Sequence, residues 1–161
     1  MKFDRFILFP WGMISRSGER AKKLLTSIKE CGFNASCFVP ETEFETCREL
    51  GLEIYCTLDK NNGHERSLAH EKVLLDPAST EEELRAVMHQ ALKGIPEDVR
   101  AIYLTDEPGA ALFPKLKTLV ECVHQDAPWA EAYINLFPKR PYSAEATAKI
   151  SSVMPKAVVN L

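Results

Sequence analysis

The sequence lacks a long hydrophobic run, a basic cluster and the common nucleotide-binding motifs. No stretch approaches the roughly 20 consecutive apolar residues of a transmembrane helix, so we expect no membrane partner. The 23 acidic and 20 basic residues are spread along the chain, which leaves no basic stripe for nucleic acid. There is no phosphate-binding loop, no G-x-G-x-x-G and no G-x-S-x-G. These absences argue against nucleotide-binding and serine hydrolase functions, and we expect no cofactor.

Cysteine is present but forms no recognisable pattern. The five cysteines are odd in number and include no C-x-x-C pair, so we expect buried free thiols in a reducing compartment. The apolar part of the N-terminus, Phe6–Pro10, is too short for a signal peptide, which predicts a cytoplasmic location. His64 and His70 flank Glu65 but lack the i, i+4 spacing of a zinc-binding helix. We therefore expect no metal site.

The sequence does contain a regular alternation of apolar runs and segments of helical period. The runs that predict strands are residues 5–13, 35–39, 52–58, 101–105 and 132–137, and a further short run at 157–161 could begin a sixth strand. The segments that predict helices are residues 18–31, 42–50, 80–94 and 113–123, with a weaker one at 143–153. Residues 59–79 are polar and are expected to be irregular. Thr80 and Glu83 have the spacing of a capping box.

This alternation predicts the fold class. Strands separated by amphipathic helices form a parallel sheet covered by helices, so we expect one α/β domain over residues 1–161. Periodicity leaves two arrangements open, a partial (β/α)8 (TIM) barrel and an open, flavodoxin-like doubly wound sheet. A full barrel needs about 250 residues. A partial one would expose sheet edges through which another chain could associate.

Polar side chains follow the ends of the expected strands, where functional groups gather in parallel α/β folds. These residues are Trp11, Glu41, Asp59, Asp106, Glu107 and Asn135. Carboxylates and amides hydrogen-bond to hydroxyl groups, and a tryptophan ring stacks on a sugar ring, so the set suits a carbohydrate. Taken singly, each residue is better explained by the ordinary polarity of loops.

Asp106 and Glu107 are the most informative of these residues, because they follow directly on an apolar strand. Pro108 is expected to hold Glu107 in an extended conformation, with its side chain at the strand tip near Trp11 and Asn135. A carboxyl group fixed there could serve as a general acid. In the alternative reading, Asp106 caps the following helix and Glu107 faces its positive end. The residues alone leave both readings open.

Several short motifs resemble a known family. Tyr103–Pro108, Ala132–Pro138, Phe9–Gly12 and Cys31–Asn34 are similar to parts of the barrel of the large retaining clan of glycoside hydrolases that includes β-galactosidases and cellulases. In that clan the fourth strand ends in Asn-Glu, and the glutamate is the acid/base. By position, the resemblance assigns this role to Glu107. Asp106 stands where the clan has asparagine.

The same resemblance implies a missing part. Retaining hydrolysis needs a second carboxylate about 5–5.5 Å from the first, and the clan places it on strand seven. None of Glu41, Asp59 and Asp106 matches that place. We therefore expect a glycoside hydrolase-like protein or fragment that acts on carbohydrate but is inactive as this chain alone. The alternative is a non-catalytic α/β domain that binds a small ligand or a partner protein with the same groups.

Overall fold

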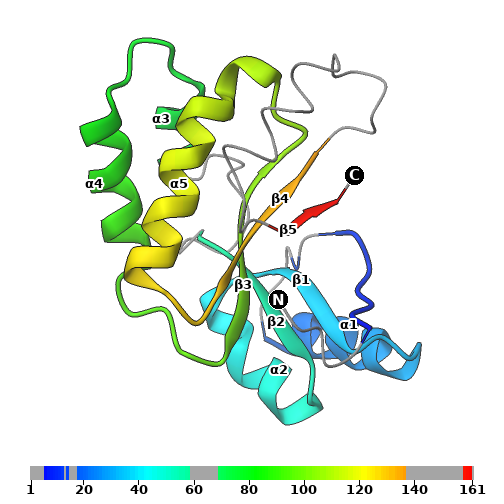
Figure 1. Cartoon of the computed structure of the whole chain (residues 1–161). Coiled ribbons are helices and arrows are strands. Elements are labelled where there is room, and N and C mark those ends of the chain that lie inside the picture. Colours follow the sequence, from blue (N-terminus) through cyan, green and yellow to red (C-terminus); the bar gives the residue numbers. More distant parts are fainter. Residues whose placement is uncertain (1–5, 13, 15–17, 59–68, 137–157, 161) are drawn as a thin grey trace. The chain divides into compact units, whose positions relative to one another are not determined.

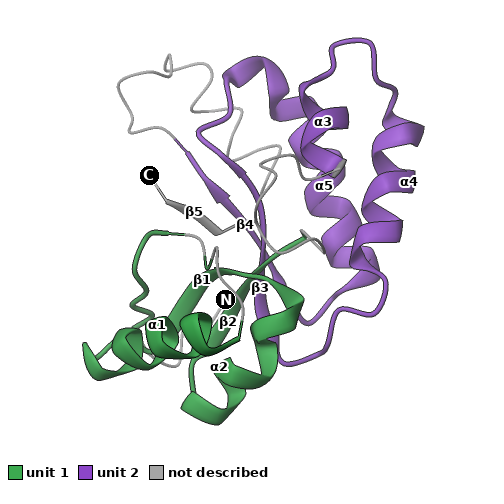
Figure 2. Cartoon of the chain, turned by 180° about the vertical axis from the view of Figure 1, so that it is seen from behind, with its two compact units in different colours: residues 1–66 green, residues 67–161 purple. Residues whose placement is uncertain are grey.

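The computed structural model describes residues 6–12, 14, 18–58, 69–136 and 158–160 (Figure 1). The chain divides into two compact units, residues 1–66 and residues 67–161, each described here by itself (Figure 2). Asp59, His64 and the helix expected at 143–153 lie outside the described residues. The single domain expected over the whole chain stays a prediction.

The described part of the first unit contains two parallel strands and their helices. Its elements are α1 (Glu19–Glu30), β1 (Ala35–Val39), the 3-10 helix η1 (Glu41–Glu43), α2 (Phe44–Leu50) and β2 (Glu53–Thr57), with β1 paired parallel to β2. Helix α1 forms as expected, because Ala21, Leu25 and Ile28 fall on one face and are buried. The buried Glu43 carboxylate accepts a hydrogen bond from the backbone N–H of Gly18, just before α1 (3.3 Å).

The first expected strand is not formed in the described residues. Residues 6–12 have no strand pairing, contrary to the prediction for residues 5–13. Leu8 is instead held by Asn34, whose backbone N–H donates to Leu8 O (3.1 Å) and whose Oδ1 accepts from Leu8 N (2.7 Å). Pro10 has no N–H to donate to a neighbouring strand, and a strand that contains proline is normally found only at the edge of a sheet. The apolar composition was therefore not sufficient for a strand.

In its described residues, the second unit has three parallel strands and three α-helices. Its elements are α3 (Ala69–Leu75), α4 (Glu81–Leu92), β3 (Val99–Asp106), the 3-10 helix η2 (Ala110–Leu112), α5 (Phe113–Asp126), β4 (Glu131–Asn135) and β5 (Val158–Asn160). Strand β4 pairs parallel with β3 and with β5. Helix α4 begins with the predicted capping box, in which Glu83 N donates to Thr80 Oγ1 (3.2 Å) and Thr80 N donates to Glu83 Oε2 (2.8 Å).

The core of the second unit joins its helices to its strands. Helix α4 packs against both α3 and α5 (Figure 1). The fully buried core side chains include Leu84 and Met88 of α4, Leu116 and Leu119 of α5, Ile102 and Leu104 of β3, and Ile134 of β4. Strand β3 is thus largely buried up to Thr105, with Arg100 and Tyr103 half-buried, as expected for a central parallel strand. This burial fixes where its polar C-terminal end emerges.

These elements confirm the predicted α/β class with parallel strands and alternating helices. Within each unit, paired strands are neighbours in chain order, and the partial barrel and the doubly wound sheet share these pairs. The short run at the C-terminus does form a strand, β5. Helix α3 was not expected, because residues 59–79 look irregular in sequence. Among the described helices, none has the length and apolar character needed to cross a membrane.

Candidate functional site

A β-bulge shapes the C-terminal end of β3. Tyr103 pairs with Tyr133 of β4, but the next pair is Thr105 with Ile134, so Leu104 is an extra residue in β3. A bulge leaves one residue out of the ladder and redirects the side chains that follow it, and bulges often lie beside functional sites. The side chains redirected here belong to Thr105 and to the predicted site residue Asp106.

The structure brings two predicted residues together. Asp106 and Asn135 are paired in register at the ends of β3 and β4. The Asn135 side-chain amide donates a hydrogen bond from Nδ2 to Asp106 Oδ1 (2.6 Å). Asp106 does not serve as the cap expected in the alternative reading, since η2 has Gly109 at its N-cap and no side-chain cap bond. Asp106 is exposed and Asn135 is half-buried, so the pair is partly accessible where the two strands end.

Glu107 lies next to this pair, in a conformation that the sequence did not predict. Its φ is 45°, not the extended value expected before Pro108. Proline disfavours the right-handed helical region for the preceding residue, and the left-handed region remains accessible at a cost. The backbone N–H of Glu107 donates to Asn135 O (2.8 Å), which anchors the turn. The side chain is exposed, so this carboxyl group is accessible to a ligand.

Helix α3 adds a carboxyl group that sequence reasoning missed. The Glu71 side chain is hydrogen-bonded to Thr105, which is 4% exposed. Burial raises the pKa of Glu71, the hydrogen bond with Thr105 lowers it in part, and the charge of Asp106 raises it further. Three acidic residues, Glu71, Asp106 and Glu107, therefore gather at the end of β3 together with the amide of Asn135.

His70 fixes α3 on the bulge. Its Nε2 lies 2.9 Å from the carbonyl oxygen of Leu104 and the residue is 1% exposed. Burial lowers the pKa of His70, and the bond to Leu104 raises it in part, which favours a neutral ring with its proton on Nε2. The sequence placed His70 in a solvated segment. The i, i+4 spacing of His70 and the buried Leu74 was the signal that could have revealed the helix.

The remaining predicted residues belong to the first unit. Trp11 is 53% exposed and packs edge-to-face against Phe38, with ring centroids 4.8 Å apart. Phe38 is the extra residue of a second bulge, in β1, and has a φ of 57°. Glu41 is exposed at the start of η1. Asp59 is not among the described residues, and the expected proximity of Trp11 to Glu107 stays a prediction.

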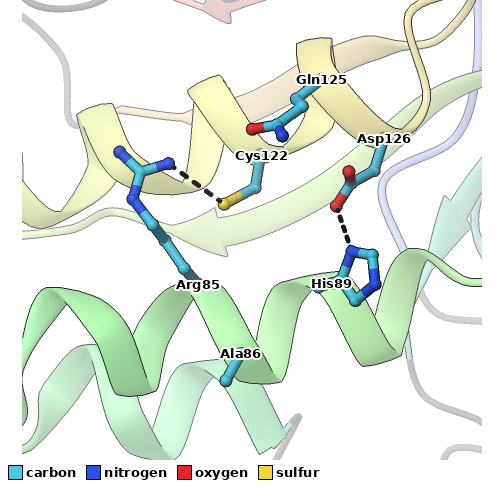
Figure 3. A pocket seen from close by; sticks show the side chains of 6 residues that line it. All are labelled: Arg85, Ala86, His89, Cys122, Gln125 and Asp126. Carbon is cyan, nitrogen blue, oxygen red and sulfur yellow. Dashed lines mark hydrogen bonds and ion pairs between the residues drawn. The ribbon is translucent and has the colours of Figure 1, made fainter.

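A groove lies between α4 and α5 (Figure 3). This groove has a volume of about 300 Å³ and is lined by Arg85, Ala86, His89, Cys122, Gln125 and Asp126. Its charges are already matched, because Arg85 pairs with Glu121 (2.7 Å) and His89 pairs with Asp126 (3.2 Å). Burial also raises the pKa of the Cys122 thiol, which disfavours a nucleophilic role. The strand ends are the better candidate site.

Comparisons with known proteins add no relative. No family model matches the chain, and no curated protein or solved structure is significantly similar to it. Within the described part of the chain, no group of three or more histidine, cysteine, aspartate or glutamate side chains is arranged to hold a metal ion. The resemblance to retaining glycoside hydrolases therefore stays a prediction, and the arrangement at the end of β3 is the basis for a functional proposal.

Proposed function

We propose that this chain is a glycoside hydrolase-like protein whose carbohydrate site lies at the C-terminal ends of β3 and β4. One observation supports this more than any other: Asp106 and Asn135 are hydrogen-bonded at the strand ends, with the exposed Glu107 carboxyl beside them. Functional groups of parallel α/β folds gather at this end of the strands. The proposal assigns the inherited acid/base role to Glu107 and substrate contacts to the other two residues.

The chemistry of these groups suits sugar hydroxyls. A carboxylate offers about four acceptor positions, and Asp106 uses one of its oxygens, Oδ1, for Asn135. This leaves acceptor capacity for hydroxyl donors of a ligand. Asn135 fixes the orientation of the carboxylate, which lowers the entropy cost of binding. Trp11 and Glu41 of the first unit, and Asp59, remain proposed contacts to the same class of ligand.

We expect binding without turnover. Glu107 would protonate the glycosidic oxygen as a general acid, but retaining hydrolysis also needs a second carboxylate at about 5–5.5 Å to meet the developing positive charge on the sugar. The resemblance places that carboxylate on strand seven, and none of Glu41, Asp59 and Asp106 matches that place. A partner chain bound at an open sheet edge could supply it, and this association also stays a proposal.

Calorimetry with simple sugars tests the proposal. Wild-type protein is titrated with cellobiose and with lactose, and saturable binding to one of them is expected. Asp106→Ala should weaken that binding at least tenfold, since it removes an acceptor and releases Asn135. His89→Ala, in the groove between α4 and α5, is the matched control and should bind like wild type. Release of nitrophenol from the corresponding aryl glycosides should stay at background. Absence of saturable binding to both sugars would contradict the proposal.

A further inference from the structure

The bulge in β3 needs a structural explanation, because side-chain direction in the sheet depends on it. Successive residues of a strand point to opposite faces, so a slip of one residue turns every later side chain to the other face. Without the extra residue Leu104, Thr105 and Asp106 would exchange faces. The bulge is therefore the feature that brings Thr105 to Glu71 and Asp106 to Asn135.

The carbonyl group at the bulge is buried and must be satisfied. Leu104 is 0% exposed, and a buried carbonyl left without a hydrogen bond destabilises the folded state. His70 of α3 provides the bond, with its Nε2 at 2.9 Å from Leu104 O. A carbonyl oxygen only accepts, so the imidazole donates from Nε2. The neighbouring residue Glu71 then lies on the same helix as this anchor.

We propose that His70 is a positioning residue of the candidate site, which holds the Leu104 bulge and thereby directs Thr105 toward Glu71 and Asp106 toward Asn135. Its relevance to carbohydrate binding rests on the proposed function, but the positioning itself does not. His70 acts through the strand end and not by contact with a ligand.

A second contact fixes the other end of α3. Lys115 of α5 donates from Nζ to Asp76 O (2.6 Å) and to Ser79 Oγ (2.6 Å), just beyond the last residue of α3. The cation thus lies at the negative end of the helix. This contact holds the C-terminal end of α3 independently of His70. His70 is the α3 side chain that is bonded to the bulge itself.

The test compares His70→Ala with the conservative His70→Gln, in which the side-chain amide can place a donor near the position of Nε2. Two NMR readouts report on the site without any ligand: exchange of the Asn135 side-chain amide protons with water, and titration of the Glu71 carboxyl carbon. His70→Ala should speed the Asn135 exchange roughly fivefold, as for the loss of one hydrogen bond, and should move the Glu71 titration. His70→Gln should restore both toward wild type, and His89→Ala should change neither.

Wild-type values of both readouts in a folded His70→Ala protein would overturn the proposal. If that variant does not fold, the wild-type protein decides by itself. A histidine ¹⁵N spectrum showing the proton on Nε2, coupled to the Leu104 carbonyl carbon, supports the positioning role, and a proton on Nδ1 overturns it. Sugar binding is not part of either readout. Correct positioning without sugar binding would therefore count against the proposed function alone.

Discussion

Glu107→Gly should stabilise the protein, because Glu107 has a φ of 45°. A left-handed conformation costs a residue with a Cβ roughly 1–2 kcal/mol, and glycine avoids this cost. Glycine also loses more backbone entropy on folding, which costs about 0.5–1 kcal/mol. The difference between the midpoints of these two ranges predicts a gain of about 0.75 kcal/mol in the free energy of unfolding. This corresponds to a rise in Tm of about 1.5–3 °C for a chain of this size.

The matched control is Glu107→Ala, which removes the same carboxyl group but keeps the Cβ. Alanine should leave stability within about 0.5 kcal/mol of wild type, since the side chain is exposed. Urea unfolding of the three proteins can be followed by circular dichroism and by tryptophan fluorescence, to which both Trp11 and Trp129 contribute. A glycine variant less stable than the alanine variant would refute the argument, because it would show that the turn carries no strain at Glu107.

Three further predictions use pKa shifts at other residues. Burial holds the pKa of His70 below the unfolded value near 6.5, so the unfolded state binds the proton more readily. The free energy of unfolding should therefore fall as pH decreases below about 6.5. Urea unfolding of His70→Gln should lack this fall. Asp106→Asn should lower the pKa of Glu71, measured by carboxyl ¹³C NMR, because the charge of Asp106 helps to raise it; an unchanged Glu71 titration would contradict this. In the native protein, iodoacetamide should modify the exposed Cys31 well before Cys56, because burial raises the pKa of the Cys56 thiol to about 12. Mass spectrometry would measure the two rates of modification. Equal rates would count against the packing of β2.

Local patterns were sufficient to predict most of the fold. The buried face of α1 and the capping box at Thr80 follow from spacings of three and four residues, and the structure confirms both. The alternation of these helices with apolar runs then predicts parallel strands. The prediction of a strand over residues 5–13 was wrong for its described residues. The backbone N–H and carbonyl of Leu8 are hydrogen-bonded to Asn34, and Pro10 has no N–H to donate. Apolar composition alone does not show whether a ladder partner exists.

The candidate site was predicted only in part, for a physical reason. Asp106 and Asn135 are the last residues of β3 and β4, and Glu107 follows directly; a place near a strand end can be read from sequence. The contribution of α3 could not be read in the same way, because His70 and Glu71 look like residues of a solvated segment. Their burial depends on contacts with Leu104 and Thr105, more than 30 positions away. The bulge is equally hidden, since register is a property of two strands together.

The central claim is that carbohydrate binds at the ends of β3 and β4, and the side-chain amide of Asn135 reports on that place directly. Its ¹H–¹⁵N resonance can be followed while wild-type protein and Asp106→Ala are titrated with cellobiose and lactose. We predict a saturable shift of the Asn135 amide in the wild type with one of these sugars, and loss of that shift in the variant. An Asn135 resonance that stays in place while either sugar binds elsewhere, or that does not respond to either sugar, would contradict the account.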